Sequence, residues 1–372
     1  MKRLFYWITL VLVSGCIYPY DAPLEQNTAK VLVVEGNLQT GALSKVTLSY
    51  LKPPNGNQTA FPTGTGYIED SSGRRYEASG DGRNLVFDTR EASPSLSYKL
   101  VVSDSGNTYE SDWLKPLDPP QLNDVVFEAD EDYVYVKLSM QAGSEGSGYA
   151  AAQIVETWKF HTDYLQQYKY DENNNVVVAL MKPDERFYYC WRTMDSGENI
   201  LIDYTELNGK VNGFTIKQFS RYDNRNHERY SILVNLRNLP PEEYRYRKVL
   251  DDNNAIGGDL FSPEPGEIPS NLRCVNKDGV QVLGYVNISQ TVSRRYFLDS
   301  RYLKQRNPGG LVIPPPDEYK RYFVRGYEPV DYTVVDNTPG VGWGPRRCFN
   351  CVEAGGTLEE PDFLNETLNY TN

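Results

Sequence analysis

The amino-acid sequence predicts a mainly β fold, in which an N-terminal Ig-like or transthyretin-like β-sandwich precedes a larger β-rich domain with one or few helices. Three observations support this class. The chain contains 29 Tyr, and aromatic residues favour strands. It also contains 29 Gly and 23 Pro, which favour the turns between strands. Short alternating or apolar runs recur along the chain, and turn residues separate them.

Residues 1–15 have the pattern of a lipoprotein signal peptide. Lys2 and Arg3 precede an almost unbroken apolar run from Leu4 to Val13, and two small residues stand directly before Cys16. Ten residues rise about 15 Å as a helix, half of the hydrocarbon core, so the run is too short to span a bilayer. We expect cleavage before Cys16, with diacylglycerol and a further acyl chain attached there. The alternative is a soluble secreted protein with a chance cysteine at the cut.

The first domain is expected at residues 29–116, after an extended tether at residues 16–28 that contains Pro19 and Pro23. The proline-rich segment 115–120 is expected to act as a stiff hinge at its end. Its strand candidates alternate or run apolar, and they lie at residues 30–36, 45–51, 66–69, 84–88 and 97–103.

The larger β-rich domain is expected at residues 117–306, and residues 307–372, rich in Pro and Gly, are expected to cover the sheets irregularly. The strand candidates of this domain lie at residues 132–139, 149–160, 175–180, 187–192, 200–207, 227–236, 280–288 and 294–298.

One helix is predicted from Pro241 to Asn253. A proline suits the first helical position, and the acidic pair Glu242 and Glu243 suits the positive end of the helix dipole. Three apolar side chains share one face of this helix, namely Tyr246, Val249 and Leu250.

The composition and motifs argue against several function classes. The net charge of −12 disfavours nucleic acid, since an acidic chain repels phosphate. The chain has none of the motifs HExxH, GxSxG, GxxxxGK[ST] or GxGxxG between strand and helix. His161 and His227, the two histidines, cannot form a multi-histidine zinc site. We therefore expect no catalytic site and no metal or cofactor.

Four cysteines follow the lipid-bearing one, and an even number in an exported protein is compatible with two disulfides in any of three connectivities. We expect Cys348 to pair locally with Cys351, and Cys190 with Cys274. The Cys348–Cys351 spacing also leaves open a redox pair or half of a zinc site, but the flanking residues are loop formers rather than the start of a helix.

Several blocks of the mature chain form a recognisable set. They are CIYPYD from Cys16, then VLVVEGNL, the pair Cys190–Trp191, RYSILVNLRNLPPEEYRYRKVLDDNNAIGGDLFSPEPGEIPSNLRCV and VLGYVNISQTVSRRYFL between Arg229 and Leu298, and CFNC from Cys348 followed by GGT and PDF. With these blocks the chain resembles the family called domain of unknown function 4249. It departs from the usual pattern at Pro240-Pro241.

The resemblance implies a lipoprotein of Bacteroidetes-type bacteria, encoded beside TonB-dependent receptors of the outer membrane. We therefore expect a non-catalytic binding or accessory subunit of such a receptor, anchored in the outer membrane and facing the cell surface. The helix and the loop at residues 255–269 are the expected receptor contacts. The alternatives are an envelope hydrolase of unrecognised type and a structural subunit of an outer-membrane assembly.

Overall fold

A computed structural model of the protein describes residues 30–51, 61–143, 147–162, 165–180, 187–197, 199–226, 228–255, 270–298, 320–335 and 338–364. Strands dominate these residues, which confirms the mainly β class. The predicted signal peptide, Cys16, the tether, His227 and the loop at residues 256–269 lie outside them.

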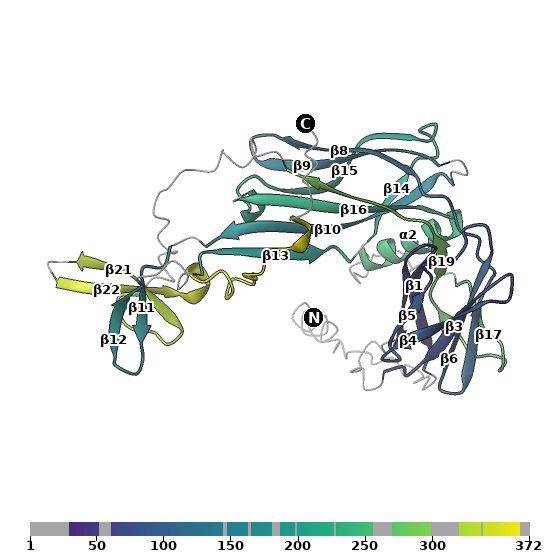
Figure 1. The fold of residues 1–372 in the computed structure, drawn as a ribbon, viewed down its shortest axis with the longest axis horizontal. Coiled ribbons are helices and arrows are strands. Elements are labelled where there is room, and N and C mark those ends of the chain that lie inside the picture. Colours follow the sequence, from purple (N-terminus) through teal and green to yellow (C-terminus); the bar gives the residue numbers. More distant parts are fainter. Residues whose placement is uncertain are drawn as a thin grey trace, which may run out of the picture.

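The first sheet has ten strands: β1 (Leu32–Gln39), β2 (Leu43–Tyr50), β3 (Thr65–Asp70), β4 (Arg75–Gly80), β5 (Asn84–Asp88), β6 (Tyr98–Asp104), β7 (Asn107–Ser111), β17 (Leu272–Cys274), β18 (Val282–Leu283) and β19 (Val286–Ser289). Their order is β17–β7–β6–β3–β4–β5–β2–β1–β18, and β19 also pairs with β1. Leu32 of β1 and Tyr109 of β7 share one buried cluster, although these strands lie far apart in the order. The sheet therefore curls around a single core (Figure 1).

Three strands of this sheet come from a distant part of the chain. Strands β17, β18 and β19 lie within residues 272–289, which the sequence assigned to the larger domain. Both β18 and β19 pair with β1 in parallel, for example Leu32 with Val282 and Leu38 with Ile288. Parallel pairing needs a long connection, and the connection from β1 to β18 consists of residues 40–281.

The larger domain forms a β-sandwich of two sheets, which we call the second sandwich. One contains β10 (Tyr149–His161), β13 (Tyr189–Asp195), β14 (Ile200–Asp203), β16 (Arg229–Leu239) and β20 (Val292–Phe297); the other contains β8 (Gln121–Ala129), β9 (Tyr133–Gln141) and β15 (Lys210–Ser220). Burial alternates residue by residue along β9, as expected for a strand with one face in a core. That core includes Val134, Trp158 and Ile232 from both sheets.

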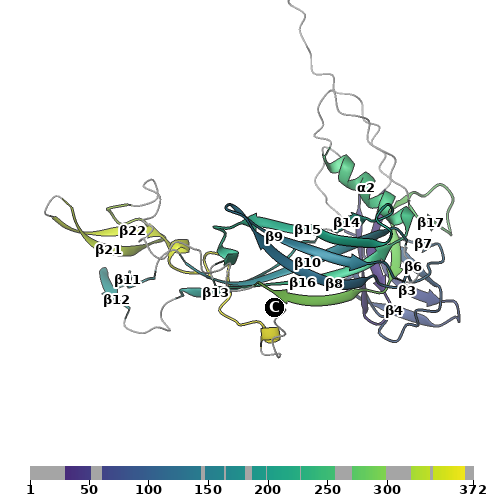
Figure 2. The same cartoon turned by 90° about the horizontal axis from the view of Figure 1, so that it is seen from above.

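Two hairpins form an arm at the end of the molecule opposite the first sheet (Figures 1 and 2). Tyr170, Phe323 and Trp343 hold the hairpins together, with ring centroids 4.7 to 5.3 Å apart. The strands of the arm are β11 (Tyr168–Asp171), β12 (Val176–Ala179), β21 (Tyr327–Val335) and β22 (Thr338–Pro345). The prediction of an irregular C-terminal segment is wrong for β21 and β22. Between β22 and residue 364, the last that the structure describes, the regular elements are two short 3-10 helices, η3 (Arg346–Cys348) and η4 (Asp362–Leu364).

Helix α2 (Pro241–Ala255) begins at the predicted residue and lies where the first sheet meets the second sandwich (Figures 1 and 2). Its buried residues are Glu243 and Tyr246, whereas Val249 and Leu250 are half-buried. A further short 3-10 helix among the described residues is η2 (Asn224–Asn226). Within the described ranges, no helix combines the length and apolar character needed to cross a membrane.

Candidate functional site

A cleft of about 600 Å³ lies between the first sheet, the second sandwich and α2, and we call it the junction cleft. Side chains from β1 and β2 form one wall, and side chains from β10, β16 and β20 form the other. Tyr246 and Arg247 of α2, together with Tyr285, also line it.

Strand alternation places polar side chains in this cleft. In β1, Val34 and Leu38 enter the core, so Glu35, Asn37 and Gln39 face the other way and line the cleft. The same rule applies to β16, where Val234 and Leu236 are core residues and Asn235 and Arg237 line the cleft. The cleft is therefore built from the outer faces of two sheets whose inner faces make separate cores.

A buried carboxylate links strand and helix at the edge of the cleft. Glu243 accepts hydrogen bonds from Arg237 Nη2 at 2.7 Å and Nη1 at 3.1 Å, a two-pronged contact. It also accepts one from Arg247 Nε at 2.8 Å. The side chain of Glu243 is 2% exposed, that of Arg237 5% and that of Arg247 21%. Two such charge-assisted contacts on one carboxylate fix both guanidinium groups in place.

The pKa of Glu243 follows from these neighbours. Burial by itself would raise the pKa, but the charges and hydrogen bonds of Arg237 and Arg247 outweigh burial and lower it from 4.5 to about 2. Glu243 is thus an anion at neutral pH. Its role is to hold the two guanidinium groups rather than to exchange protons.

Two tyrosines stand beside this charged group. The rings of Tyr246 and Tyr285 lie 5.5 Å apart at 33°. Burial raises the pKa of each phenol to about 12, and the nearby carboxylates Glu35 and Glu243 add to the effect at Tyr246 and Tyr285 respectively. Both phenols are therefore neutral at physiological pH and can donate a hydrogen bond.

A second buried carboxylate lies inside the second sandwich and not in the cleft. Glu156 is 2% exposed and contacts Lys217 at 2.9 Å and Arg225 at 2.8 Å. Tyr230 donates a further hydrogen bond to it, 2.9 Å long. Two cations and one phenol thus neutralise and hydrogen-bond the carboxylate of Glu156. We interpret this set of residues as a structural ion cluster. Across the ranges that the structure covers, no three His, Cys, Asp or Glu side chains gather closely enough to hold a metal ion.

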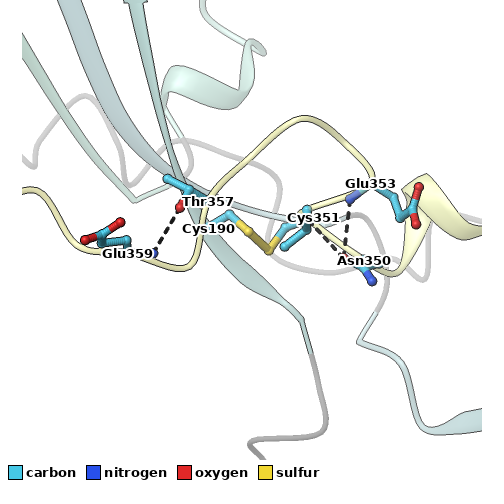
Figure 3. The surroundings of a disulfide bond; sticks show 7 residues. Cys190, Asn350, Cys351, Glu353, Thr357 and Glu359 are labelled. Atoms are coloured by element: carbon cyan, nitrogen blue, oxygen red, sulfur yellow. Dashed lines mark hydrogen bonds between the residues drawn. A yellow bond between two sulfur atoms is a disulfide. The ribbon is translucent and has the colours of Figure 1, made fainter.

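The disulfide of the described chain joins Cys190 of β13 to Cys351, in the segment that follows β22 (Figure 3). Beside it, Trp191 and Thr357 exchange two backbone hydrogen bonds of 2.7 and 2.8 Å. The covalent bond and the hydrogen bonds together attach the C-terminal segment to the edge of the second sandwich.

The predicted disulfide pairing is therefore wrong. Cys274 lies in β17 of the first sheet and Cys190 in β13 of the second sandwich, so the expected partners belong to different sheets. Cys348 lies in η3 against Phe349, and both Cys274 and Cys348 carry thiols. A CxxC spacing does not determine where the two Cβ atoms point, and that direction decides whether a bond can form.

The residues of the cleft are not among the predicted site residues. Glu243 is expected from the sequence only as an acidic residue that suits a helix N-terminus, yet two sequence signals point to its partners. Arg237 interrupts the apolar run of residues 229–239, and a cation in a buried strand requires a partner. Glu243 and Arg247 are spaced four residues apart on one helix, which places them side by side.

Comparisons with known proteins complete the description of the site. No curated protein matches the chain. Among solved structures, a two-domain fibronectin type-III segment from chicken tenascin is similar at 8% identity, covering 56% of this chain and 89% of its own; its TM-score of 0.16 supports no inference. The model of a family described as "Domain of unknown function (DUF4249)" matches residues 17–295, a range that contains every residue lining the cleft. This match spans well over half of the chain, so the protein belongs to the domain of unknown function 4249 family.

Proposed function

We propose that this protein acts by binding, as a non-catalytic accessory subunit that is lipid-anchored to the outer membrane and works with a TonB-dependent receptor. The observation that carries the proposal is the junction cleft. Concave sites between structural units, with a few well-placed polar groups, are where proteins commonly bind small ligands. Here Glu243 holds Arg237 and Arg247 in position before any ligand arrives, which lowers the entropic cost of binding.

The proline-rich segment that connects the first sheet to the second sandwich favours a preformed cleft. We call the first sheet and the second sandwich the two bodies of the molecule. The backbone carbonyl of Asp118, within the proline-rich segment, accepts a 2.7 Å hydrogen bond from Asn238 Nδ2 in β16. Leu117 accepts another from the backbone N–H of Gln290, which follows β19. The segment is thus tied to both bodies, and the two walls of the cleft are held relative to each other.

The membrane and receptor parts of the proposal rest on the chain's N-terminal pattern and on what the family resemblance implies. Two partners on one membrane meet at a high effective concentration, so a modest intrinsic affinity keeps them together. The arm offers a candidate contact surface, because Tyr322 and Phe323 are 67% and 47% exposed there. Aromatic side chains are enriched in the cores of protein interfaces.

The experiment is a pull-down of the tagged protein from detergent-solubilised outer membranes, followed by mass spectrometry. We expect a TonB-dependent receptor barrel at near-stoichiometric yield. Tyr322→Ala should reduce receptor recovery, whereas Tyr222→Ala should not; Tyr222 is 69% exposed and lies beside η2, outside the arm. Recovery of the protein alone in mild detergent would refute the receptor partnership. Turnover of a glycan or peptide by the purified protein would refute the non-catalytic assignment.

A further inference from the structure

We propose that the junction cleft binds a saccharide that carries a carboxylate, and that Arg247 and Arg237 anchor this carboxylate. The inference rests on the proposed binding function and adds the class of ligand.

The first support is the charge of the cleft. Its described lining contains three cations, Lys45, Arg237 and Arg247, and one carboxylate, Glu35. Glu243 lies behind the two arginines and balances one of these charges. The cleft thus keeps a positive excess in a chain whose net charge is −12. A local reversal of sign favours an anionic group at this place.

The second support is the count of hydrogen-bond donors on the two arginines. A guanidinium group has five N–H donors. Glu243 accepts two hydrogen bonds from Arg237, through Nη1 and Nη2, and one from Arg247, through Nε. Arg247 Nη2 also lies 2.7 Å from the same carboxylate as an ion pair. Among the described residues no other group accepts a hydrogen bond from these two guanidinium groups, so their remaining donors are open to solvent or a ligand. A carboxylate matches two parallel guanidinium donors in geometry and charge.

The third support is the neutral part of the lining. Four amide side chains line the cleft, those of Asn37, Gln39, Gln153 and Asn235. Ser289 and Ser293 each donate one hydrogen bond to the amide oxygens of Asn37 and Asn235, and the Gln153 amide donates one to Asp195. Each amide keeps further donor or acceptor capacity for a ligand. The Oγ1 atom of Thr291 is buried at this lining, and no described residue is its partner. A ligand that satisfies so many neutral groups must carry many hydroxyls itself.

The two tyrosines give the cleft an aromatic surface beside these amides. Tyr246 and Tyr285 present tilted rings at the lining, together with the neutral phenols described above. A ring face suits the apolar C–H face of a sugar, while a phenol suits its hydroxyls. Amides, phenols and guanidinium groups together fit an acidic saccharide better than a peptide, whose side chains need apolar subsites.

The test is isothermal titration of the mature protein in detergent with the trimers of galacturonate, glucuronate, mannuronate and guluronate. Each acidic trimer is paired with its methyl ester, which keeps the hydroxyls and loses the charge. We expect at least one acidic trimer to bind, and its ester to bind at least about tenfold more weakly.

Variants locate the site. Arg247→Gln should lower the affinity for the acidic trimer about tenfold or more, and Lys45→Gln by a smaller factor that shrinks further at high salt. Asn235→Ala should weaken the acidic trimer and its ester alike, because it removes a contact to hydroxyls. Lys210→Gln is the matched control, since Lys210 is an exposed lysine at the start of β15, outside the cleft, and it should leave the affinity unchanged.

Each other outcome has a definite meaning. If no acidic trimer binds at millimolar concentration while the receptor still co-purifies, the ligand class is wrong and the proposed function stands. Equal affinity for acid and ester refutes the carboxylate anchor, and tighter binding of an acidic peptide refutes the saccharide. If Arg247→Gln fails to fold, the variants Lys45→Gln and Asn235→Ala test the site instead. Unchanged affinity for the acidic trimer in both variants would refute binding in the junction cleft.

Discussion

At the scale of single residues, Glu243 connects β16 to α2, because Arg237 belongs to the strand and Arg247 to the helix. A buried ion pair that keeps all its partners contributes little net stability, but removal of one partner leaves charge without compensation. The network therefore positions the cleft wall more than it stabilises the fold, and it is sensitive to any change at Glu243.

Glu243→Gln should destabilise the protein by about 3 to 5 kcal/mol, because two guanidinium groups would remain in a buried site without a counter-charge. Urea unfolding followed by fluorescence measures this change. Glu242→Gln is the control: the Glu242 side chain is 59% exposed and pairs with exposed Arg245, so its loss should change stability by less than about 0.5 kcal/mol. Equal effects of the two substitutions would contradict the proposed role.

The same carboxylate should make stability depend on pH in acid. Its pKa is about 2 in the folded protein against an ordinary value of 4.5, so its contribution is fully present above pH 4.5 and is lost as the pH falls toward 2. A difference of this size corresponds to about 3 kcal/mol. Urea unfolding at pH 5 and pH 2.5 should show a smaller acid loss in Glu243→Gln than in the natural protein, and parallel losses would be evidence against this assignment.

At the scale of elements, the disulfide attaches the C-terminal segment to β13. Cys190 and Cys351 are 161 residues apart, and a cross-link over such a loop stabilises by at most about 5 kcal/mol on chain-entropy grounds. Cys351→Ser should therefore lower the unfolding temperature strongly. Cys348→Ser, which keeps the disulfide, should cost only about 1 kcal/mol.

Peptide mapping without reduction checks the connectivity behind that prediction. We expect one linked peptide pair that contains Cys190 and Cys351, with Cys274 and Cys348 open to alkylation after unfolding. A linked peptide that joins Cys348 to Cys351 would show that the local pairing forms instead.

The parallel pairing of β18 and β19 with β1 depends on a close backbone approach at Gly284. Its φ is +116°, and a Cβ there would lie 1.9 Å from the carbonyl oxygen of Val34. Gly284→Ala should destabilise by about 3 kcal/mol or more, because both the backbone angle and the contact become unfavourable.

Gly279→Ala is the matched control for this substitution. Gly279 also has a positive φ, +73°, but a Cβ there would meet nothing within 4 Å, so only the backbone penalty of about 1 kcal/mol remains. Thermal unfolding of the two variants compares them directly. Equal losses would mean that the approach of Gly284 to β1 contributes nothing.

At the scale of the whole molecule, the N-terminal pattern predicts a lipid anchor at Cys16, and the family resemblance implies that the membrane is the outer one. Cys16→Ala should abolish acylation and release the protein from the outer membrane, or leave it uncleaved. Metabolic labelling with a fatty acid, followed by membrane fractionation, measures both effects. Cys274→Ala is the control, because Cys274 is a thiol in the first sheet, and it should leave acylation unchanged. Continued acylation of the Cys16 variant would disprove the lipoprotein prediction.

Much of the fold is readable from local patterns. The alternation in residues 132–139 predicts β9, and the proline and acidic residues near Pro241 predict the start of α2. Strand β15 lacked a clear signal, because its register shifts near Gly213 interrupt the period of two. The hairpin of β21 and β22 was missed because Pro329 and several glycines indicated an irregular segment.

The sequence by itself determined the mainly β class and where α2 begins, because both depend on residues that are neighbours in the chain. The lipid anchor at Cys16 is also read from neighbouring residues, and it stays a prediction. The tertiary structure decided that β18 and β19 join β1 and that Cys190 pairs with Cys351. These contacts close long loops, and the entropy of closing a loop grows only slowly with its length, so local patterns carry almost no information on which distant residues meet. Burial of apolar side chains in the two cores brings those residues together. The junction cleft then forms between the outer face of the first sheet and the outer face of the second sandwich.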